Sequence, residues 1–195
     1  MARKNDLKEK ILKESIRLFS KNGFEKTTFQ KIADRCKISQ ANCFYYFKNK
    51  MELYEACVSY IVSVNETHTL LNAESIKEDG YERLLNYGYG NIDWSLKHPE
   101  QYQVILMLYY LASFDPKFKA LYTEILKNAR FKVLGCLYAG EREGVLSAKE
   151  DPEWISEVLH EALAGIVMNA ATSNCQNTEE KMKRKWRDLV ELYLK

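Results

Sequence analysis

Residues 27–50 read TTFQKIADRCKISQANCFYYFKNK, and they contain the clearest structural signals of the chain. It opens with Thr27 and Thr28, whose hydroxyls suit the free N–H groups at the start of a helix. Thr27 followed by Gln30 three residues later also fits the capping-box pattern, in which two side chains cap a helix start reciprocally. Isoleucine and alanine follow at a helical spacing. The pattern predicts a short helix over about 27–36.

A second short helix is expected directly after the first. Lys37-Ile38 forms a break, and Ser39 is a good cap for a helix over 40–47. Upstream, apolar residues at steps of three to five predict a helix over about 6–21. This helix should end at Asn22-Gly23, where glycine is free to adopt the left-handed conformation. Three helices with a tight turn between the last two are typical of a helix-turn-helix.

In a helix-turn-helix the last helix lies in the major groove and its exposed side chains read base edges. Gln40 and Asn42 would project from the start of this helix, and an amide side chain can pair with the N6/N7 edge of adenine. Lys50 should also lie at the start of a fourth helix, where free N–H groups favour an anion. Four residues further along carry hydroxyl or ammonium groups that could bind DNA phosphates, namely Tyr45, Tyr46, Lys48 and Lys50.

Residues 11–53 resemble the DNA-binding domain of TetR-like (tetracycline-repressor family) regulators. The resemblance rests on an ordered series: Phe19, Gly23, Thr27-Thr28, Ile32-Ala33, Ile38-Ser39, the aromatic run ending at Phe47, and Lys50 with Leu53. It implies a homodimer, a ligand pocket in the C-terminal domain and, as a rule, repression. Carried over by position, the DNA-facing residues are Thr28, Gln30, Ser39, Gln40, Ala41, Asn42, Phe44, Tyr45, Tyr46 and Lys50.

Three positions depart from the family pattern. Lys37 stands where the family often has glycine in the turn, and a lysine there is strained if its φ is positive. Ala41 replaces the usual glycine, and its methyl group could touch a thymine methyl. Phe44 replaces the usual tyrosine and so lacks one hydroxyl for a phosphate or base contact.

The charge distribution supports binding to a polyanion. The chain of 195 residues has a formal net charge of +2, but residues 1–50 hold 13 basic and 5 acidic side chains, a net of +8. The remainder holds 16 basic and 22 acidic side chains, a net of −6. A basic end on an acidic body is typical of a module that meets nucleic acid. The alternative, a three-helix subdomain that no longer binds DNA, does not explain this excess.

The rest of the chain also predicts helices and no β-strand pattern. A long fourth helix is expected over about 50–72 as a connector, followed by five more at about 79–96, 99–113, 116–142, 152–173 and 178–194. Aspartates before Pro116 and Pro152 indicate helix starts, because proline lacks an N–H that the first helical position does not use. We therefore expect an all-α fold of about nine helices, with a helix-turn-helix DNA-binding domain at 1–50 and a helical ligand-binding and dimerisation domain at 51–195.

The last two helices carry apolar stripes that suit a dimer interface. Two such helices from each of two chains would form a four-helix bundle, and a two-fold operator needs two readers about 34 Å apart. Packing of both stripes inside one protomer is the alternative. The interface residues expected are Ile155, Leu159, Ala162, Ile166, Trp186, Leu189, Val190 and Tyr193.

Aromatic residues are frequent between the connector and the expected interface helices. Such residues line pockets for apolar or aromatic ligands, although an ordinary core would have the same composition. The expected pocket residues are Trp94, Tyr102, Tyr109, Tyr110, Phe114 and Tyr122.

Several other classes of protein are disfavoured. The sequence contains no nucleophile-elbow motif, no phosphate-binding glycine-rich loop and no HExxH motif, so we expect no enzyme and no cofactor. The five cysteines and three histidines are scattered, which predicts reduced thiols and no metal site. No apolar run is long enough for a membrane span, and the polar start does not resemble a secretory signal, so a cytoplasmic location is expected.

The function expected from the sequence is transcriptional regulation. The main hypothesis is a homodimeric repressor that binds an inverted-repeat operator and is released by a small apolar or aromatic ligand. The alternative is a dimeric DNA-binding regulator without a small-molecule effector, controlled by a protein partner.

Overall fold

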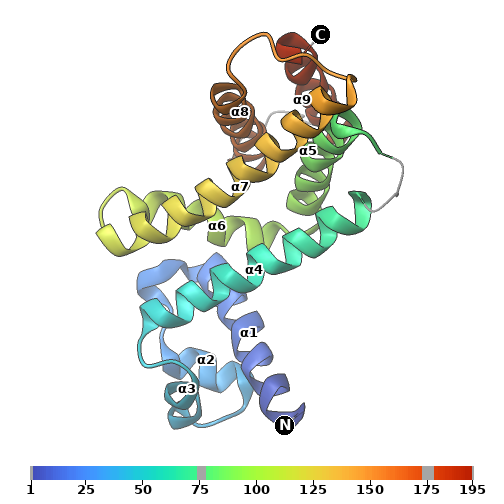
Figure 1. Cartoon of the computed structure of the whole chain (residues 1–195). Helices are drawn as coiled ribbons and strands as arrows, with labels where there is room; N and C mark the ends of the chain where they lie inside the picture. The colour runs from blue at the N-terminus through green and yellow to red at the C-terminus, as the bar shows by residue number, and fades with distance from the viewer. Residues whose placement is uncertain (1, 74–77, 173–177, 195) are drawn as a thin grey trace. The chain divides into compact units, whose positions relative to one another are not determined.

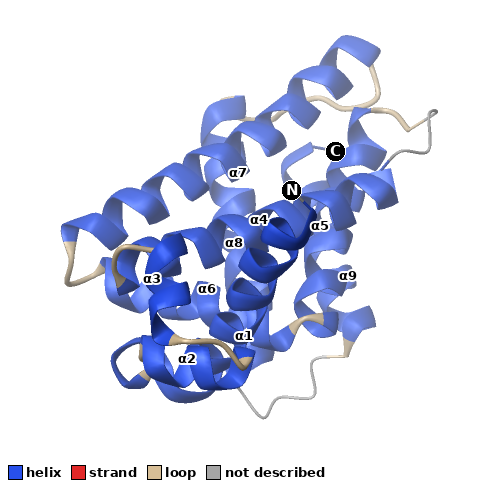
Figure 2. Ribbon diagram, turned by 90° about the horizontal axis from the view of Figure 1, so that it is seen from below, coloured by secondary structure: helices blue, strands red, loops and turns tan. Residues whose placement is uncertain are grey.

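The computed structural model describes residues 2–73, 78–172 and 178–194 and is helical almost throughout (Figure 2). The described residues form nine helices (Figure 1), which confirms the expected fold class. Their bounds are α1 Ala2–Lys26, α2 Phe29–Cys36, α3 Gln40–Tyr46, α4 Lys50–Ala73, α5 Gly80–Lys97, α6 Pro99–Ala112, α7 Pro116–Glu143, α8 Pro152–Thr172 and α9 Glu179–Leu194.

The proline-marked helix starts are capped as expected. The Asp115 carboxylate accepts a hydrogen bond from the Lys117 N–H at 2.8 Å, and the Asp151 carboxylate accepts one from the Trp154 N–H at 3.1 Å. Both bonds satisfy N–H groups that have no partner within the first turn of a helix.

The first helix differs from the expectation at both ends. It begins at Ala2 and is assigned through Lys26, but Gly23 interrupts it with φ 79° and ψ 171°. The φ is positive, as expected for this glycine, while ψ is extended rather than left-handed helical. The regular part of α1 therefore stops at the expected glycine, and a short turn follows it.

The chain divides into two compact units, each described here by itself. The first comprises Met1–Val64 and His98–Lys119, and the second comprises Asn65–Lys97 and Ala120–Lys195. The first unit is larger than the DNA-binding domain expected at 1–50, because it also contains the start of α4 and the whole of α6. A functional boundary at residue 50 stays a prediction.

An aromatic cluster forms the core of the first unit. Phe19, Phe24, Tyr54 and Phe118 contact one another with ring centroids 5.1 to 5.8 Å apart. The buried Tyr54 hydroxyl donates to the Val104 carbonyl at 2.7 Å, which satisfies its only polar atom. This cluster joins α1, α4, α6 and the start of α7, while α2 packs against α1 and α3 packs against α2. The three-helix head is therefore built on a rigid apolar base.

The second unit packs α5 against α9 and α9 against α8. Trp186 of α9 is fully buried and lies on Gly88 of α5, where a Cβ atom would come within 2.1 Å of the indole. The indole N–H donates to the Leu85 carbonyl at 3.2 Å. This contact explains the glycine inside α5, since any side chain at Gly88 would displace the tryptophan.

Candidate nucleic-acid interface

The start of α2 is fixed by two adjacent threonines with different roles. Thr28 is the N-cap, and its hydroxyl oxygen accepts a hydrogen bond from the Lys31 N–H at 3.3 Å. Thr27 is buried, and its hydroxyl lies 3.1 Å from the Leu18 carbonyl and 2.9 Å from the Gly23 carbonyl of α1. The expected capping box of Thr27 with Gln30 is therefore wrong. The adjacent residue caps the helix, while Thr27 ties α2 to α1.

The turn between α2 and α3 depends on one left-handed residue. Lys37 adopts φ 57° and ψ 47° and ends α2, and its N–H donates to the Asp34 carbonyl at 3.2 Å. The next N–H, that of Ile38, donates to the Ala33 carbonyl at 3.0 Å. These bonds satisfy the last carbonyls of α2, as in glycine-terminated helices. The family's usual glycine is thus absent, but its conformation is retained by a lysine.

Ser39 positions the start of α3. Its side-chain oxygen accepts a hydrogen bond from the Asn42 N–H at 3.3 Å, and its hydroxyl lies 2.9 Å from the Asn42 Oδ1 atom. On the inner side of the helix, Cys43 and Phe47 are buried. A short helix of seven residues is thereby held in a defined rotation about its axis, with one side turned to solvent.

The outer side of this head contains nearly all of the residues expected to face DNA. Tyr46 and Lys50 are half-buried. The other residues expected there are exposed, namely Thr28, Gln30, Ser39, Gln40, Ala41, Asn42, Phe44, Tyr45 and Lys48. The Gln30 amide nitrogen donates to the Asp34 carboxylate at 2.7 Å, which leaves the amide oxygen of Gln30 available to a donor. Contact of these residues with DNA stays a prediction.

Lys50 has protein partners where a phosphate contact was expected. Its ammonium donates to the carbonyls of Phe24 at 3.0 Å and Glu25 at 3.3 Å, and it lies 4.4 Å from the centroid of the Phe24 ring. The ammonium also lies 3.8 Å from the Glu25 carboxylate. Lys50 therefore ties the start of α4 to the end of α1. In this arrangement its donors point into the protein.

A cap at the start of α4 was missed from the sequence. The Asn49 side-chain oxygen accepts a hydrogen bond from the Glu52 N–H, and the Glu52 carboxylate accepts one from the Lys48 N–H, both at 2.9 Å. Asparagine followed three residues later by glutamate is a capping signal that the sequence does contain. The acidic Glu52 already lies at this helix start, so the site is less suited to an anion than expected.

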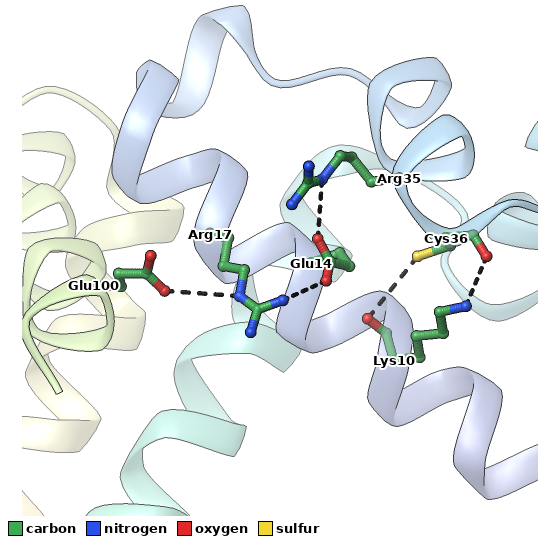
Figure 3. A network of polar contacts seen from close by, with 6 residues as sticks. All are labelled: Lys10, Glu14, Arg17, Arg35, Cys36 and Glu100. Atoms are coloured by element: carbon green, nitrogen blue, oxygen red, sulfur yellow. Dashed lines mark hydrogen bonds and ion pairs between the residues drawn. The ribbon is translucent and has the colours of Figure 1, made fainter.

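A polar network fastens α2 to α1, as Figure 3 shows. The Glu14 carboxylate of α1 binds both Arg17 of the same helix and Arg35 of α2, the latter at 3.1 Å. The Lys10 ammonium donates to the Cys36 carbonyl at the end of α2 at 2.9 Å. A cation at this position stabilises the exposed carbonyls of a helix end.

The same network reaches α6 within the first unit. Arg17 lies 3.9 Å from the Glu100 carboxylate, and the Ser20 hydroxyl donates to the Gln103 side-chain oxygen at 2.9 Å. Exposed ion pairs of this kind contribute about 0–1 kcal/mol each. Their effect here is to fix the orientation of helices whose stability comes from the apolar core.

The cysteines of the head are buried packing residues. Burial raises the pKa of the Cys43 thiol to about 11, and burial also raises the pKa of Cys36. Both thiols are therefore protonated at neutral pH, which lowers their reactivity. Cys36, Cys43, Cys57 and Cys136 are free thiols, and Cys175 lies outside the described residues. No cluster of three potential metal ligands occurs among the described residues.

The expected dimer-interface residues divide into two groups. Ile155, Leu159, Trp186 and Val190 are fully buried inside the protomer, so their side chains are not available to a partner. The packing of these four follows the alternative reading, in which the stripes pack within one chain. Ala162, Ile166, Leu189 and Tyr193 are half-buried. Sequence analysis missed the exposed apolar residues of the same two helices, Trp154, Met168 and Leu192.

The expected pocket residues also occupy different environments. Trp94 and Tyr102 are buried, and Tyr109 and Tyr122 are half-buried. Tyr110 and Phe114 are exposed, with 66% and 72% of their surfaces accessible, and their rings lie 5.0 Å apart. The six residues belong to both compact units. A shared pocket for them stays a prediction.

The head defined by these contacts is a helix-turn-helix, the element with which DNA-binding regulators read the major groove. Comparison with known proteins identifies the class more closely. Residues 11–57 match the family of bacterial regulatory proteins called the tetR family. The uncharacterized HTH-type transcriptional regulator YerO from Bacillus subtilis is 48% identical over 64 residues, which cover 32% of this chain and 22% of that protein.

Longer matches extend through the rest of the chain. An Escherichia coli K12 protein described as "Probable acrEF/envCD operon repressor" is 21% identical over 164 residues, covering 83% of this chain and 74% of that protein. A transcriptional regulator from Saccharomonospora viridis, solved in complex with choline, has the same fold with a TM-score of 0.82 at 18% identity, covering 97% and 98% of the two chains. The N-terminal head of the chain therefore matches the tetR family, and the chain as a whole has the fold of solved regulators of that type.

These matches show the family of the N-terminal head and the fold of the chain. The match to YerO spans only about a fifth of that protein, so the activity of the whole relative does not carry over directly. Among the described residues, none of the helices combines the length and the apolar character that a membrane crossing requires.

Proposed function

We propose that this chain is a repressor that binds an inverted-repeat operator as a homodimer in the cytoplasm. The observation that supports this most directly is the construction of the head. Ser39 caps α3, Lys37 fixes the turn before it, and the outer side of α3 is exposed over Gln40, Ala41 and Asn42. A helix held in this way is suited to insertion into a major groove.

The charges of the head support binding to the phosphate backbone. The net charge of +8 within residues 1–50 favours a polyanion, and Lys48 is exposed immediately after α3. Part of the basic excess has structural partners, since Arg17 and Arg35 bind Glu14 and Lys50 binds backbone carbonyls. Operator binding should therefore weaken with salt less steeply than the full count of basic residues implies.

Dimerisation is proposed through the outer sides of α8 and α9. Trp154 of α8 and Tyr193 of α9 contact each other with ring centroids 5.6 Å apart, and Leu192, which precedes Tyr193 in α9, is 60% exposed. Exposed apolar side chains gathered on two neighbouring helices are typical of an interface. Two protomers joined through these helices would form the four-helix bundle expected from the sequence.

Release by a small apolar or aromatic ligand is the regulatory part of the proposal. The choline complex of the Saccharomonospora viridis regulator supports ligand binding by this fold. A ligand releases the operator only if it binds the DNA-incompetent conformation more tightly than the competent one. For this chain the proposal names only the class of ligand, a small apolar or aromatic molecule.

Fluorescence anisotropy tests the DNA-binding part. A duplex from the region upstream of the gene should bind the full chain with an affinity that falls as salt rises, and the Gln40→Ala, Asn42→Ala double variant should bind at least tenfold more weakly, since each base contact is worth about 1–3 kcal/mol. The variant Phe131→Ala serves as a control, because Phe131 lies on α7 with 74% of its surface exposed. Equal binding by all three proteins would contradict the proposal.

Sedimentation and a reporter assay test the remaining parts. The wild-type chain should sediment as a dimer, and replacing the exposed Trp154 and Leu192 by serine should yield monomers with a native far-UV spectrum. In cells, the wild type should lower expression from its operator, and the monomeric variant should not. A monomeric wild type would contradict the dimer, since one head cannot contact both half-sites.

A further inference from the structure

The exposed side of α3 carries an apolar surface that Ala41 and Phe44 form together. Ala41 and Phe44 lie three residues apart and therefore on the same side of the helix. Phe44 has 48% of its surface exposed, although its ring lies 4.5 Å from the buried ring of Phe29. The phenyl group is thus supported from behind by α2 and open at its outer edge. A large apolar side chain held in this way suits an apolar contact on a partner.

Asn42, which follows Ala41 in α3, has a fixed polarity. Its backbone N–H donates to the Ser39 side-chain oxygen at 3.3 Å, so the hydroxyl hydrogen of Ser39 remains free to donate. That hydroxyl lies 2.9 Å from Asn42 Oδ1, which turns the amide oxygen back toward the helix start. The amide nitrogen is left as the outward group, and it has two hydrogens to donate. Asn42 therefore presents donors to a ligand.

A donor beside an apolar surface matches one base edge. In the major groove, thymine presents the O4 acceptor and the C5 methyl group next to each other. Adenine requires an amide oxygen to accept from its N6 group, and Ser39 already binds that oxygen of Asn42. Cytosine presents a donor, and guanine presents acceptors without a methyl group. The adenine contact expected for Asn42 is therefore not the one that its hydrogen bonds favour.

We propose that α3 reads a thymine in each half-site, with Ala41 and Phe44 on its methyl group and the Asn42 amide nitrogen on its O4 atom. The inference rests on the proposed function, and it names the base that the recognition helix selects. The partner is duplex DNA because the head that carries this surface has a net charge of +8 over residues 1–50. The apolar contact then gives specificity, while the basic side chains supply affinity that does not depend on sequence.

The test uses the full-length chain and chemically modified DNA. Selection from a random duplex pool gives the preferred site, and each thymine in that site is then replaced by deoxyuridine, which lacks only the methyl group. At one symmetric pair of positions, we expect deoxyuridine in one half-site to lower the binding affinity about fourfold and deoxyuridine in both half-sites to lower it about fifteenfold. The reason is that burying one methyl-sized group is worth about 0.8 kcal/mol. Fluorescence anisotropy at constant salt measures these ratios.

Two variants separate the contacts. Phe44→Ala should lower the ratio of its affinities for the thymine and deoxyuridine sites below that of the wild type, with Ala41 keeping its own contact with the methyl group. Phe131→Ala, changed at an exposed phenylalanine on α7, should retain the full ratio. Asn42→Ala should weaken binding to the selected site by about thirtyfold or more, because one base contact is lost in each half-site while Ser39 still caps the backbone. Circular dichroism and thermal melting establish that each variant is folded.

The outcomes distinguish the inference from the function beneath it. If no duplex is enriched by the selection, the proposed function fails and the inference fails with it. If a site is enriched but no thymine-to-deoxyuridine change weakens wild-type binding by more than twofold, the thymine contact is refuted while the function stands. An adenine contact by Asn42 is indicated instead if 7-deazaadenine weakens binding by the wild type and not by Asn42→Ala. The comparison of thymine and deoxyuridine sites with the wild-type chain does not depend on whether Phe44→Ala folds.

Discussion

Replacing Lys37 by glycine should stabilise the protein. Lys37 is exposed and ends α2 in the left-handed conformation, with φ 57° and ψ 47°. Among the described residues it is the one non-glycine residue with positive φ. The hydrogen bonds of this turn, from the N–H groups of Lys37 and Ile38, use only the backbone. A glycine retains both bonds and removes the steric conflict between Cβ and the carbonyl oxygen.

The magnitude follows from two opposing effects. A left-handed conformation costs a residue with a Cβ atom about 1–2 kcal/mol, which glycine avoids. Glycine also gains conformational freedom in the unfolded chain, which costs about 0.4–1 kcal/mol. The net gain is about 0.5–1 kcal/mol, which corresponds to a rise in Tm of about 1–4 °C for a chain of this size.

Lys37→Ala is the matched control. It removes the same charge and the same side chain beyond Cβ but keeps the strained backbone, so it should be no more stable than the wild type. Thermal melting followed by circular dichroism, with urea unfolding as a second probe, compares the three proteins. If the glycine variant melts at or below the temperature of the alanine variant, the strain assigned to Lys37 is refuted.

Three further predictions concern the rest of the chain. Gly88→Ala should destabilise the protein by about 3 kcal/mol in urea unfolding, because the new Cβ would come within 2.1 Å of the Trp186 indole. Gly135→Ala on α7 is the control: no atom lies within 4 Å of its new Cβ, so this variant should be neutral or slightly stabilising. Burial, and then a neighbouring arginine, lower the pKa of His160 in the folded chain. The unfolded chain therefore binds more protons below about pH 6.5, and the free energy of unfolding should fall as the pH drops from 7 to 5. A His160→Asn variant that keeps the full pH dependence would refute this. Lys50→Gln should lower Tm in the absence of DNA, because it removes an ammonium that binds two carbonyls, and an unchanged Tm would assign Lys50 to DNA instead.

Helix positions followed closely from the sequence, because their signals are local. A cap such as Ser39, or an aspartate before Pro116, acts on N–H groups two or three residues away. The same locality explains why the exposed residues of α3 could be named in advance. It also explains the error at Thr27, since two adjacent hydroxyls offer the same local signal and only the packing against α1 distinguishes them.

Contacts between residues far apart in the chain could not be predicted from such local signals. Lys50 binds carbonyls 25 and 26 positions away, so its sequence neighbours do not reveal that it is occupied. The stripes of α8 and α9 contain apolar residues at helical spacing, but spacing does not say which partner covers them. The fold buries Trp186 on Gly88, 98 positions earlier, and leaves Leu192 exposed on the same helix.

Local signals in the sequence were enough to predict that this chain forms helices, where most of them begin, and that three of them make a basic helix-turn-helix head. Only the folded chain shows which apolar side chains remain at the surface and that the ammonium of Lys50 is turned inward. The difference lies in how far apart along the chain the interacting groups are. Backbone hydrogen bonds and caps act over a few residues, whereas burial and side-chain orientation depend on groups that meet only when the chain has folded.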